Sequence, residues 1–170
     1  MVDEKYLLDA NTFMTPYESF YSFDLAPGFW TQLKPTLLKE NVAIMDVVKN
    51  EVDKGRDSLT EWMDSVDGLV VLDRREPEII MKYSEVLKYL QDSELYTDKA
   101  LRTWSNASVA DPWLIAAASA KGYTLVTFEK SAGKITSPSG KPKIPDVARE
   151  FGVSCVDLYY FIRKMGIKWN

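Results

Sequence analysis

The sequence of 170 residues contains no histidine. It therefore lacks the general base of Ser-His-Asp and Cys-His hydrolases, the imidazole ligands of most zinc sites, and the acid and base of histidine-dependent nucleases. Any catalysis must come from carboxylates, lysine, tyrosine, hydroxyl groups, or a metal ion held by oxygen. Oxygen ligands favour Mg²⁺ or Mn²⁺.

Cysteine and long apolar runs are also scarce. Cys155 is the single cysteine, so no disulfide can form within the chain, which is typical of the reducing cytoplasm. Its apolar neighbours indicate a small core residue. The chain has no run of about 18 apolar residues, and its start, residues 1–5, is acidic. We therefore expect no signal peptide, no contact with a membrane and a cytoplasmic location.

The composition is that of a globular domain, with 46% hydrophobic and 27% charged residues, and the length predicts one domain over residues 1–170. The net charge of −4 is unevenly distributed. Residues 1–120 carry 12 Lys and Arg against 21 Asp and Glu, whereas residues 121–170 carry 9 against 4. This asymmetry indicates either a basic surface on an acidic body or a solvated face of mixed lysines.

Hydrophobic periodicity predicts strands that alternate with helices. Strands are expected at 5–9, 42–46, 123–127 and 153–156, and residues 70–72 are either a short strand or an extended connection. Helices are expected at 27–38, 47–55, 57–62, 76–90, 97–104, 110–122, 144–152 and 157–165. This order predicts an α/β fold with a central parallel sheet of about four to five strands and helices on both faces.

An aromatic-rich loop is expected between the first strand and the helix near Pro27. Its side chains can pack into the core or form a wall on which nucleic-acid bases stack, and core packing is the simpler interpretation. The aromatic residues concerned are Phe13, Tyr17, Phe20, Tyr21, Phe23, Phe29 and Trp30.

Four carboxylates occupy positions where a site can form. Asp9 and Glu129 follow apolar strands, and polar residues at the carboxyl ends of parallel strands line the ligand-binding crevice of such sheets. Glu51 lies beside an apolar helix stripe, where it is either exposed at the rim or bound to a cation. Asp111 precedes Pro112, which predicts a helix N-cap and explains this carboxylate without any function.

Carboxylates that converge on one crevice repel one another and raise their pKa values unless a cation neutralises them. A hard divalent ion with oxygen ligands fits that requirement. One or two such ions can activate a water molecule and stabilise charge on a phosphodiester during in-line displacement. This chemistry requires no histidine.

The ordered set of motifs resembles the PIN domain over roughly residues 5–165. The residues that carry the resemblance are Leu7-Leu8-Asp9-Ala10-Asn11, Asn50-Glu51-Val52, and residues 110–118 followed by 122–127. The segments at residues 27–30 and 143–147 resemble a bacterial subgroup of PIN-like proteins, the DUF4411 type.

The resemblance implies a Mg²⁺- or Mn²⁺-dependent endoribonuclease, often the toxin of a toxin–antitoxin pair like the VapC proteins. It implies that the acidic metal site consists of Asp9, Glu51, Asp111 and Glu129, and that Asn11 and Thr127 orient a carboxylate or a metal-bound water. RNA would approach along Lys130, Lys134, Lys141 and Lys143. An antitoxin protein and a homodimer are the partners expected from the family.

One residue departs from the family pattern. The last acid is usually Asp after Thr-x, whereas Thr127-Phe128-Glu129 supplies a longer Glu. This difference motivates a second hypothesis, a PIN-like binding or regulatory module with little catalysis. A third hypothesis is a phosphatase with Asp9 as nucleophile, but such enzymes place a second Asp two residues later, where this chain has Asn11.

Overall fold

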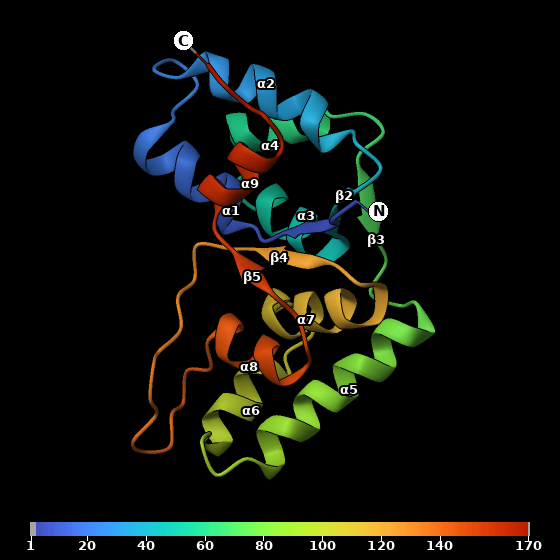
Figure 1. Cartoon of the computed structure of the whole chain (residues 1–170), viewed down its shortest axis with the longest axis vertical. Helices are drawn as coiled ribbons and strands as arrows, with labels where there is room; N and C mark the ends of the chain where they lie inside the picture. Colours follow the sequence, from blue (N-terminus) through green and yellow to red (C-terminus); the bar gives the residue numbers. More distant parts are fainter. Residues whose placement is uncertain (1–2, 170) are drawn as a thin grey trace.

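The computed structural model describes residues 3–169 and shows one sheet between two layers of helices (Figure 1). Met1, Val2 and Asn170 lie outside the described residues, and the start of the acidic N-terminal segment lies there with them. Five parallel strands are arranged in the order β3-β2-β1-β4-β5. Their bounds are β1 Tyr6–Leu8, β2 Val42–Met45, β3 Val70–Leu72, β4 Thr124–Val126 and β5 Cys155–Val156. The predicted parallel sheet is confirmed, and residues 70–72 form its edge strand.

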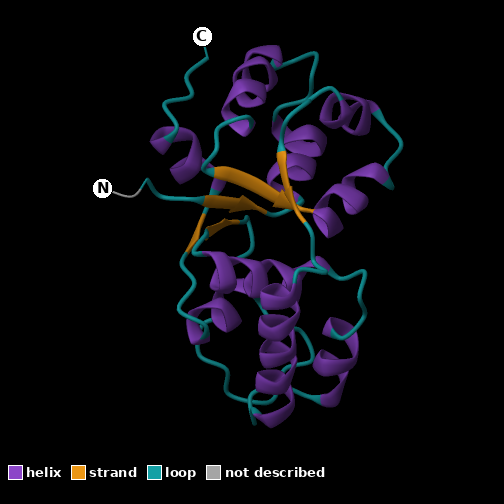
Figure 2. Cartoon of the chain, turned by 90° about the vertical axis from the view of Figure 1, so that its right-hand side faces the viewer, coloured by secondary structure: helices purple, strands orange, loops and turns teal. Residues whose placement is uncertain are grey.

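Helices cover both faces of the sheet, as expected for parallel strands joined by crossover connections (Figures 1 and 2). One layer contains α1 Asn11–Thr15, α2 Pro27–Leu37, α3 Asp46–Asp53, α4 Ser58–Asp64 and α9 Leu158–Lys164. The other layer contains α5 Pro77–Asp92, α6 Asp98–Trp104, α7 Ala110–Lys121 and α8 Ile144–Glu150. No helix among the described residues is long and apolar enough to cross a membrane.

The register of the central strands aligns their carboxyl ends. Leu8 of β1 pairs with Ile44 of β2 on one side and with Val126 of β4 on the other. The residues that follow β1 and β4 are therefore neighbours, and the backbone N–H of Asp9 donates to the carbonyl of Val126 at 3.0 Å. This register brings two of the predicted site segments together before any side-chain contact is considered.

The core explains the composition of the strands and of α7. Leu7, Leu8 and Ile44 are completely buried, as expected for strands covered on both faces. In α7, Ala116 and Ala117 are also completely buried, and their small side chains let the helix approach the sheet closely. Gly122 ends α7 in the left-handed conformation at φ 73°, which favours glycine and turns the chain toward β4.

Residues 11–20 differ from the prediction of a loop. They form α1 and a π-helical turn, η1 Pro16–Phe20. The sequence shows no helical periodicity here, because this short segment is stabilised by burial of Phe13 and by aromatic contacts of Tyr17 and Phe20 rather than by a regular apolar stripe. Phe13, Phe29 and Trp30 are buried, which confirms core packing for these rings, whereas Phe20 remains 39% exposed.

A long connection from β4 to α8 extends along the second helical layer (Figure 1). It is held at its far end, where Tyr96 and Ser139 form a parallel bridge. At its near end the buried carboxylate of Asp146 accepts hydrogen bonds from the Ser131 hydroxyl and from the Ala132 N–H. The connection is thus tied to the body at both ends, although much of its surface is exposed.

Candidate functional site

Asp9 is buried where β1 ends, with only 6% of its surface exposed. One oxygen, Oδ1, accepts from the N–H of Ala10 at 2.7 Å, and Oδ2 accepts from the Thr127 hydroxyl at 2.8 Å. These two bonds favour the charged form, but burial dominates and raises the pKa of Asp9 to about 6. The sequence therefore places a carboxylate in the interior without a cationic partner among the described residues.

Thr127 and Asn11 connect the ends of β1 and β4. The Thr127 hydroxyl accepts from Asn11 Nδ2 at 3.2 Å and from the N–H of Glu129 at 3.1 Å. Asn11 in turn accepts from the N–H of Phe128 at 3.1 Å. The network fixes the rotamer of Asp9 and the direction in which the chain leaves β4, which is the placement that an orienting role for Asn11 and Thr127 requires.

Asp111 is not the N-cap of α7. The helix begins at Ala110, Val109 occupies the cap position, and no side chain caps it. Asp111 therefore lies in the first turn of α7, and its carboxylate forms no cap hydrogen bond. The capping prediction was wrong because the helix starts two residues earlier than the Asp-Pro pair indicates. Without that capping role, the structural explanation for this carboxylate disappears.

The other three acids contribute to the electrostatic state of Asp111. Burial is the main cause that raises its pKa to about 7, and repulsion by Asp9, Glu129 and Glu51 raises it further. Asp9 is likewise raised by Glu51 and Glu129. Four elements, β1, α3, α7 and the segment after β4, thus bring carboxylates within electrostatic reach of one another at the carboxyl end of the sheet.

Glu51 lies at the rim of this group. Its side chain is exposed by accessible area, which agrees with the rim interpretation of the helix pattern. Neighbouring protein atoms nevertheless displace enough water to raise the pKa of Glu51, while Lys54 acts in the opposite direction. The two descriptions are compatible, because a side chain can be exposed on one side while protein atoms surround the other. We call the group of Asp9, Glu51, Asp111 and Glu129, with the Thr127 hydroxyl that donates to Asp9, the acidic crevice.

Glu129 has a cationic neighbour. The ammonium group of Lys143, from the end of the long connection, lies 3.6 Å from Glu129 Oε1. Burial raises the pKa of Glu129, and Lys143 lowers it. Lys143 is thus the described basic residue that forms an ion pair with a member of the acidic crevice, and it does so at the position where the family motif has a shorter acid.

The donor set of the crevice fits a hard divalent cation. All four candidates supply carboxylate oxygens, which Mg²⁺ and Mn²⁺ prefer, and their mutual repulsion is the kind that a cation relieves. Within residues 3–169, no three Asp, Glu or Cys side chains stand close enough together to form a completed metal-binding cluster. Coordination would therefore require side-chain rotation, most of all by Glu129, which faces Lys143.

The four predicted RNA-binding lysines do not form one row. Lys143 pairs with Glu129, and Lys130 lines a pocket beside that residue. Lys134 lines a separate hollow with Tyr96 and Asp146. Lys141 follows the Ser139 bridge near the start of α6. The structure brings Lys130 and Lys143 to the acidic crevice and places Lys134 and Lys141 farther along the connection.

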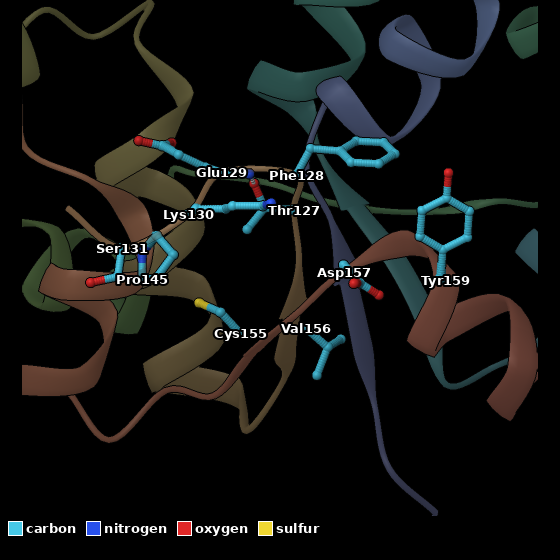
Figure 3. A pocket seen from close by; sticks show the side chains of 10 residues that line it. All are labelled: Thr127, Phe128, Glu129, Lys130, Ser131, Pro145, Cys155, Val156, Asp157 and Tyr159. Carbon is cyan, nitrogen blue, oxygen red and sulfur yellow. Dashed lines mark hydrogen bonds between the residues drawn. The ribbon is translucent and has the colours of Figure 1, made fainter. Parts of the chain in front are cut away.

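A pocket of about 360 Å³ adjoins the crevice (Figure 3). Thr127 and Glu129 belong to both, and the remaining wall comes from the long connection, β5 and the start of α9. The sequence did not indicate this pocket, because Asp157 stands at the start of a predicted helix, where a capping role explains it, and Phe128 stands between Thr127 and Glu129 without a motif of its own. The residues not shared with the crevice are Phe128, Lys130, Ser131, Pro145, Cys155, Val156, Asp157 and Tyr159.

Comparisons with known proteins agree on the architecture. The model of a family described as a domain of unknown function, DUF4411, matches residues 6–169. No curated protein matches the chain. Among solved structures, VapBC2 from Rickettsia felis bound to a DNA fragment from its promoter aligns with a TM-score of 0.52 and 18% identity, covering 89% of this chain and 97% of that one.

A second structure, DNA-bound VapBC from Salmonella typhimurium, aligns with a TM-score of 0.50 and 16% identity. The alignment covers 91% of this chain and 98% of the other. At such identities the likeness concerns the fold, and it spans nearly the full length of both partners. The chain therefore belongs to the DUF4411 family and has the PIN-like fold of the VapC toxins.

Proposed function

We propose that the protein is a Mg²⁺- or Mn²⁺-dependent endoribonuclease. The observation that carries the proposal is the convergence of four carboxylates from four elements on the carboxyl end of the sheet. Their repulsion makes the crevice unfavourable without a cation, which is a cost that a binding site for divalent metal explains.

Each residue has a role in this proposal. Asp9 and Asp111 hold the principal ion, and Glu51 and Glu129 complete the site or hold a second ion. Asn11 and Thr127 keep Asp9 oriented through the bonds described above. When bound, the metal supplies an activated water and charge stabilisation for phosphodiester hydrolysis. The proposed products carry a 5′-phosphate and a 3′-hydroxyl.

The basic residues beside the crevice complete the proposed substrate site. Lys130 and Lys143 lie where they can contact phosphates, and such contacts make binding sensitive to salt. The two similar solved structures are VapBC complexes bound to DNA, and by analogy the proposal includes an antitoxin protein as the partner of this chain. A homodimer and a cytoplasmic location remain predictions of the same kind.

The test is cleavage of a mixed single-stranded RNA by the full-length protein with Mn²⁺, with Mg²⁺ and with EDTA. We expect cleavage with either metal, none with EDTA and none by Asp9→Asn. Activity that persists in EDTA or in Asp9→Asn would refute the proposed metal chemistry.

A PIN-like binding module is the second candidate function. The ion pair of Lys143 with Glu129 favours it, because a lysine can neutralise that carboxylate in place of a metal. Calorimetry with Mn²⁺ separates the two candidates. Binding that is lost in Asp9→Asn supports the nuclease, whereas no binding at millimolar Mn²⁺ supports the module.

A further inference from the structure

The pocket beside the acidic crevice has one aromatic wall. Phe128 and Tyr159 lie on the same side of it, with ring centroids 6.5 Å apart and planes at 84°, and Ser131 and Pro145 lie opposite (Figure 3). Phe20 extends the wall, since its ring centroid lies 6.0 Å from that of Phe128. Tyr159 is 40% exposed, so its ring is available to a flat ligand.

The floor of the pocket is mostly apolar, and its polar groups stand at the edges. Cys155 and Val156 of β5 form the floor, while Lys130 and Asp157 contribute charges of opposite sign. About 360 Å³ is within the size range of small-ligand sites, which starts near 300 Å³. A planar heterocycle with a polar edge fits such a lining better than a phosphate, because the carboxylates of Glu129 and Asp157 outnumber the single ammonium group of Lys130.

Asp157 has one oxygen free for a ligand. Its Oδ1 accepts from the N–H of Tyr160 at 2.7 Å and so caps α9. Its Oδ2 takes no part in this cap. Because the cap fixes the side chain, the second oxygen is held ready at the pocket edge as an acceptor.

We propose that this pocket is a nucleobase subsite that selects guanine next to the cleaved phosphodiester. Thr127 and Glu129 are shared with the crevice, so a base in the pocket places its own phosphate beside the carboxylates. Stacking on Tyr159 and Phe128 serves any base. Guanine presents two adjacent N–H donors on its Watson–Crick edge, and both can point at the one free oxygen of Asp157. The other bases present a single donor position beside acceptor atoms, which repel that oxygen. The placement next to a cleaved bond rests on the proposed nuclease function.

The test measures binding of GMP, AMP, CMP and UMP to the full-length protein in EDTA by ligand-observed NMR titration. We expect GMP to bind about tenfold more tightly than the other three. Asp157→Asn keeps the cap on α9 but replaces the free acceptor by a donor, so it should abolish the preference for GMP. Tyr159→Ala should weaken all four by about tenfold, and Tyr159→Phe should restore them.

Asp57→Asn is the matched control, because Asp57 caps α4 in the same manner by accepting from the N–H groups of Leu59 and Thr60 at 3.1 Å. It should leave the preference unchanged. Equal binding of the four nucleotides, no binding of any, or a GMP preference that survives Asp157→Asn would overturn the subsite. GMP selectivity in a protein that cleaves no RNA supports the subsite and removes the nuclease, whereas cleavage without GMP selectivity does the reverse.

Discussion

Carboxylates at the two ends of the sheet are in opposite electrostatic states. At the end where β1 and β4 begin, hydrogen bonds lower the pKa of Glu4, chiefly from Tyr6, and that of Glu78, chiefly from Lys121. At the end where the same strands finish, burial and mutual repulsion raise the pKa values of Asp9 and Asp111. Carboxylates at the amino end are thus stabilised by hydrogen-bond donors, whereas Asp9 and Asp111 at the carboxyl end have no cationic partner among the described residues.

This contrast shows how the chain divides stability and function. Lys121 forms ion pairs with Glu76 and Glu78, and Lys5 donates to the carbonyl of Lys121. The charged groups at the amino end of the sheet are therefore paired by ordinary surface contacts. The carboxyl end costs stability in the absence of a ligand. Buried carboxylates that lack a cationic partner within residues 3–169 mark the carboxyl end of the sheet as the candidate functional site.

The largest expected effect is on RNA cleavage. Asp111→Asn removes one of the proposed metal ligands and should reduce the cleavage rate at least about 100-fold with Mn²⁺. Glu78→Gln makes the same kind of change at the other end of the sheet and should leave the rate unaltered. Equal losses in the two variants would show that the acidic crevice has no special role.

The second effect concerns stability without metal. The pKa of Asp111 is raised from 3.8 to about 7 in the folded protein. The folded state therefore binds more protons than the unfolded state between these values, and the free energy of unfolding falls as the pH rises from about 4 to 7. Asp111→Asn removes this penalty and should stabilise the protein by a few kcal/mol at pH 8 and by almost nothing near pH 4.

Urea unfolding in EDTA at both pH values measures this difference. Glu78→Gln is again the control, and we expect it to change the free energy of unfolding in the opposite direction. Because its pKa is lowered in the folded protein, Glu78 contributes stability above its ordinary pKa that is lost on acidification. A destabilised Asp111→Asn at pH 8 would contradict the contrast between the two ends.

Lys143 offers a smaller test, since it supplies a cation to the acidic end. Lys143→Met should raise the affinity for Mn²⁺ a few-fold, because the ammonium group no longer competes at Glu129. The same variant should bind RNA more weakly and with a shallower dependence on salt. Lys141→Met serves as the control for calorimetry, because Lys141 lies farther along the connection, where its backbone N–H donates to Ser139, whereas Lys143 is the lysine paired with Glu129. An unchanged affinity for Mn²⁺ in Lys143→Met would separate Lys143 from the metal site.

The smallest effect is expected at the amino end. Lys121→Met breaks both ion pairs of the residue, yet these pairs lie at the surface and should contribute about 0.5–1 kcal/mol to the free energy of unfolding. Urea unfolding at low and high salt measures the loss, which should shrink as salt screens the pairs. A loss of several kcal/mol would mean that these ion pairs contribute more to stability than ordinary surface pairs do.

Much of the fold followed from periodicity in the sequence. The buried strands β1, β2 and β4 are short apolar runs that stop at polar residues, and Gly122 marks the end of α7. Residues 11–20 could not be predicted, since their helical turns depend on contacts with rings that lie far along the chain, such as Phe128 against Phe20. Such long-range contacts cannot be predicted from the local sequence pattern.

The sequence predicted the four acidic residues of the candidate site better than it predicted the helix cap and the positions of the lysines around them. The order of Asp9, Glu51, Asp111 and Glu129 in the sequence indicated one crevice, and the structure brings them within electrostatic reach. The Asp-Pro pair predicted that Asp111 caps α7, whereas the helix begins two residues before Pro112 and leaves the Asp111 carboxylate without a capping role. The positions of the four lysines could not be predicted either. The path of the long connection depends on contacts such as the Tyr96–Ser139 bridge and the hydrogen bond from Ala132 to Asp146, and not on its composition.

The position of Cys155 has a practical consequence. The only thiol of the chain lies in the floor of the pocket and is half-buried, and burial raises its pKa to about 11. A thiol reagent will therefore react slowly and at one defined place. Its reaction rate becomes an intrinsic reporter of pocket occupancy, read without any added chromophore or engineered residue, in which a bound ligand appears as protection.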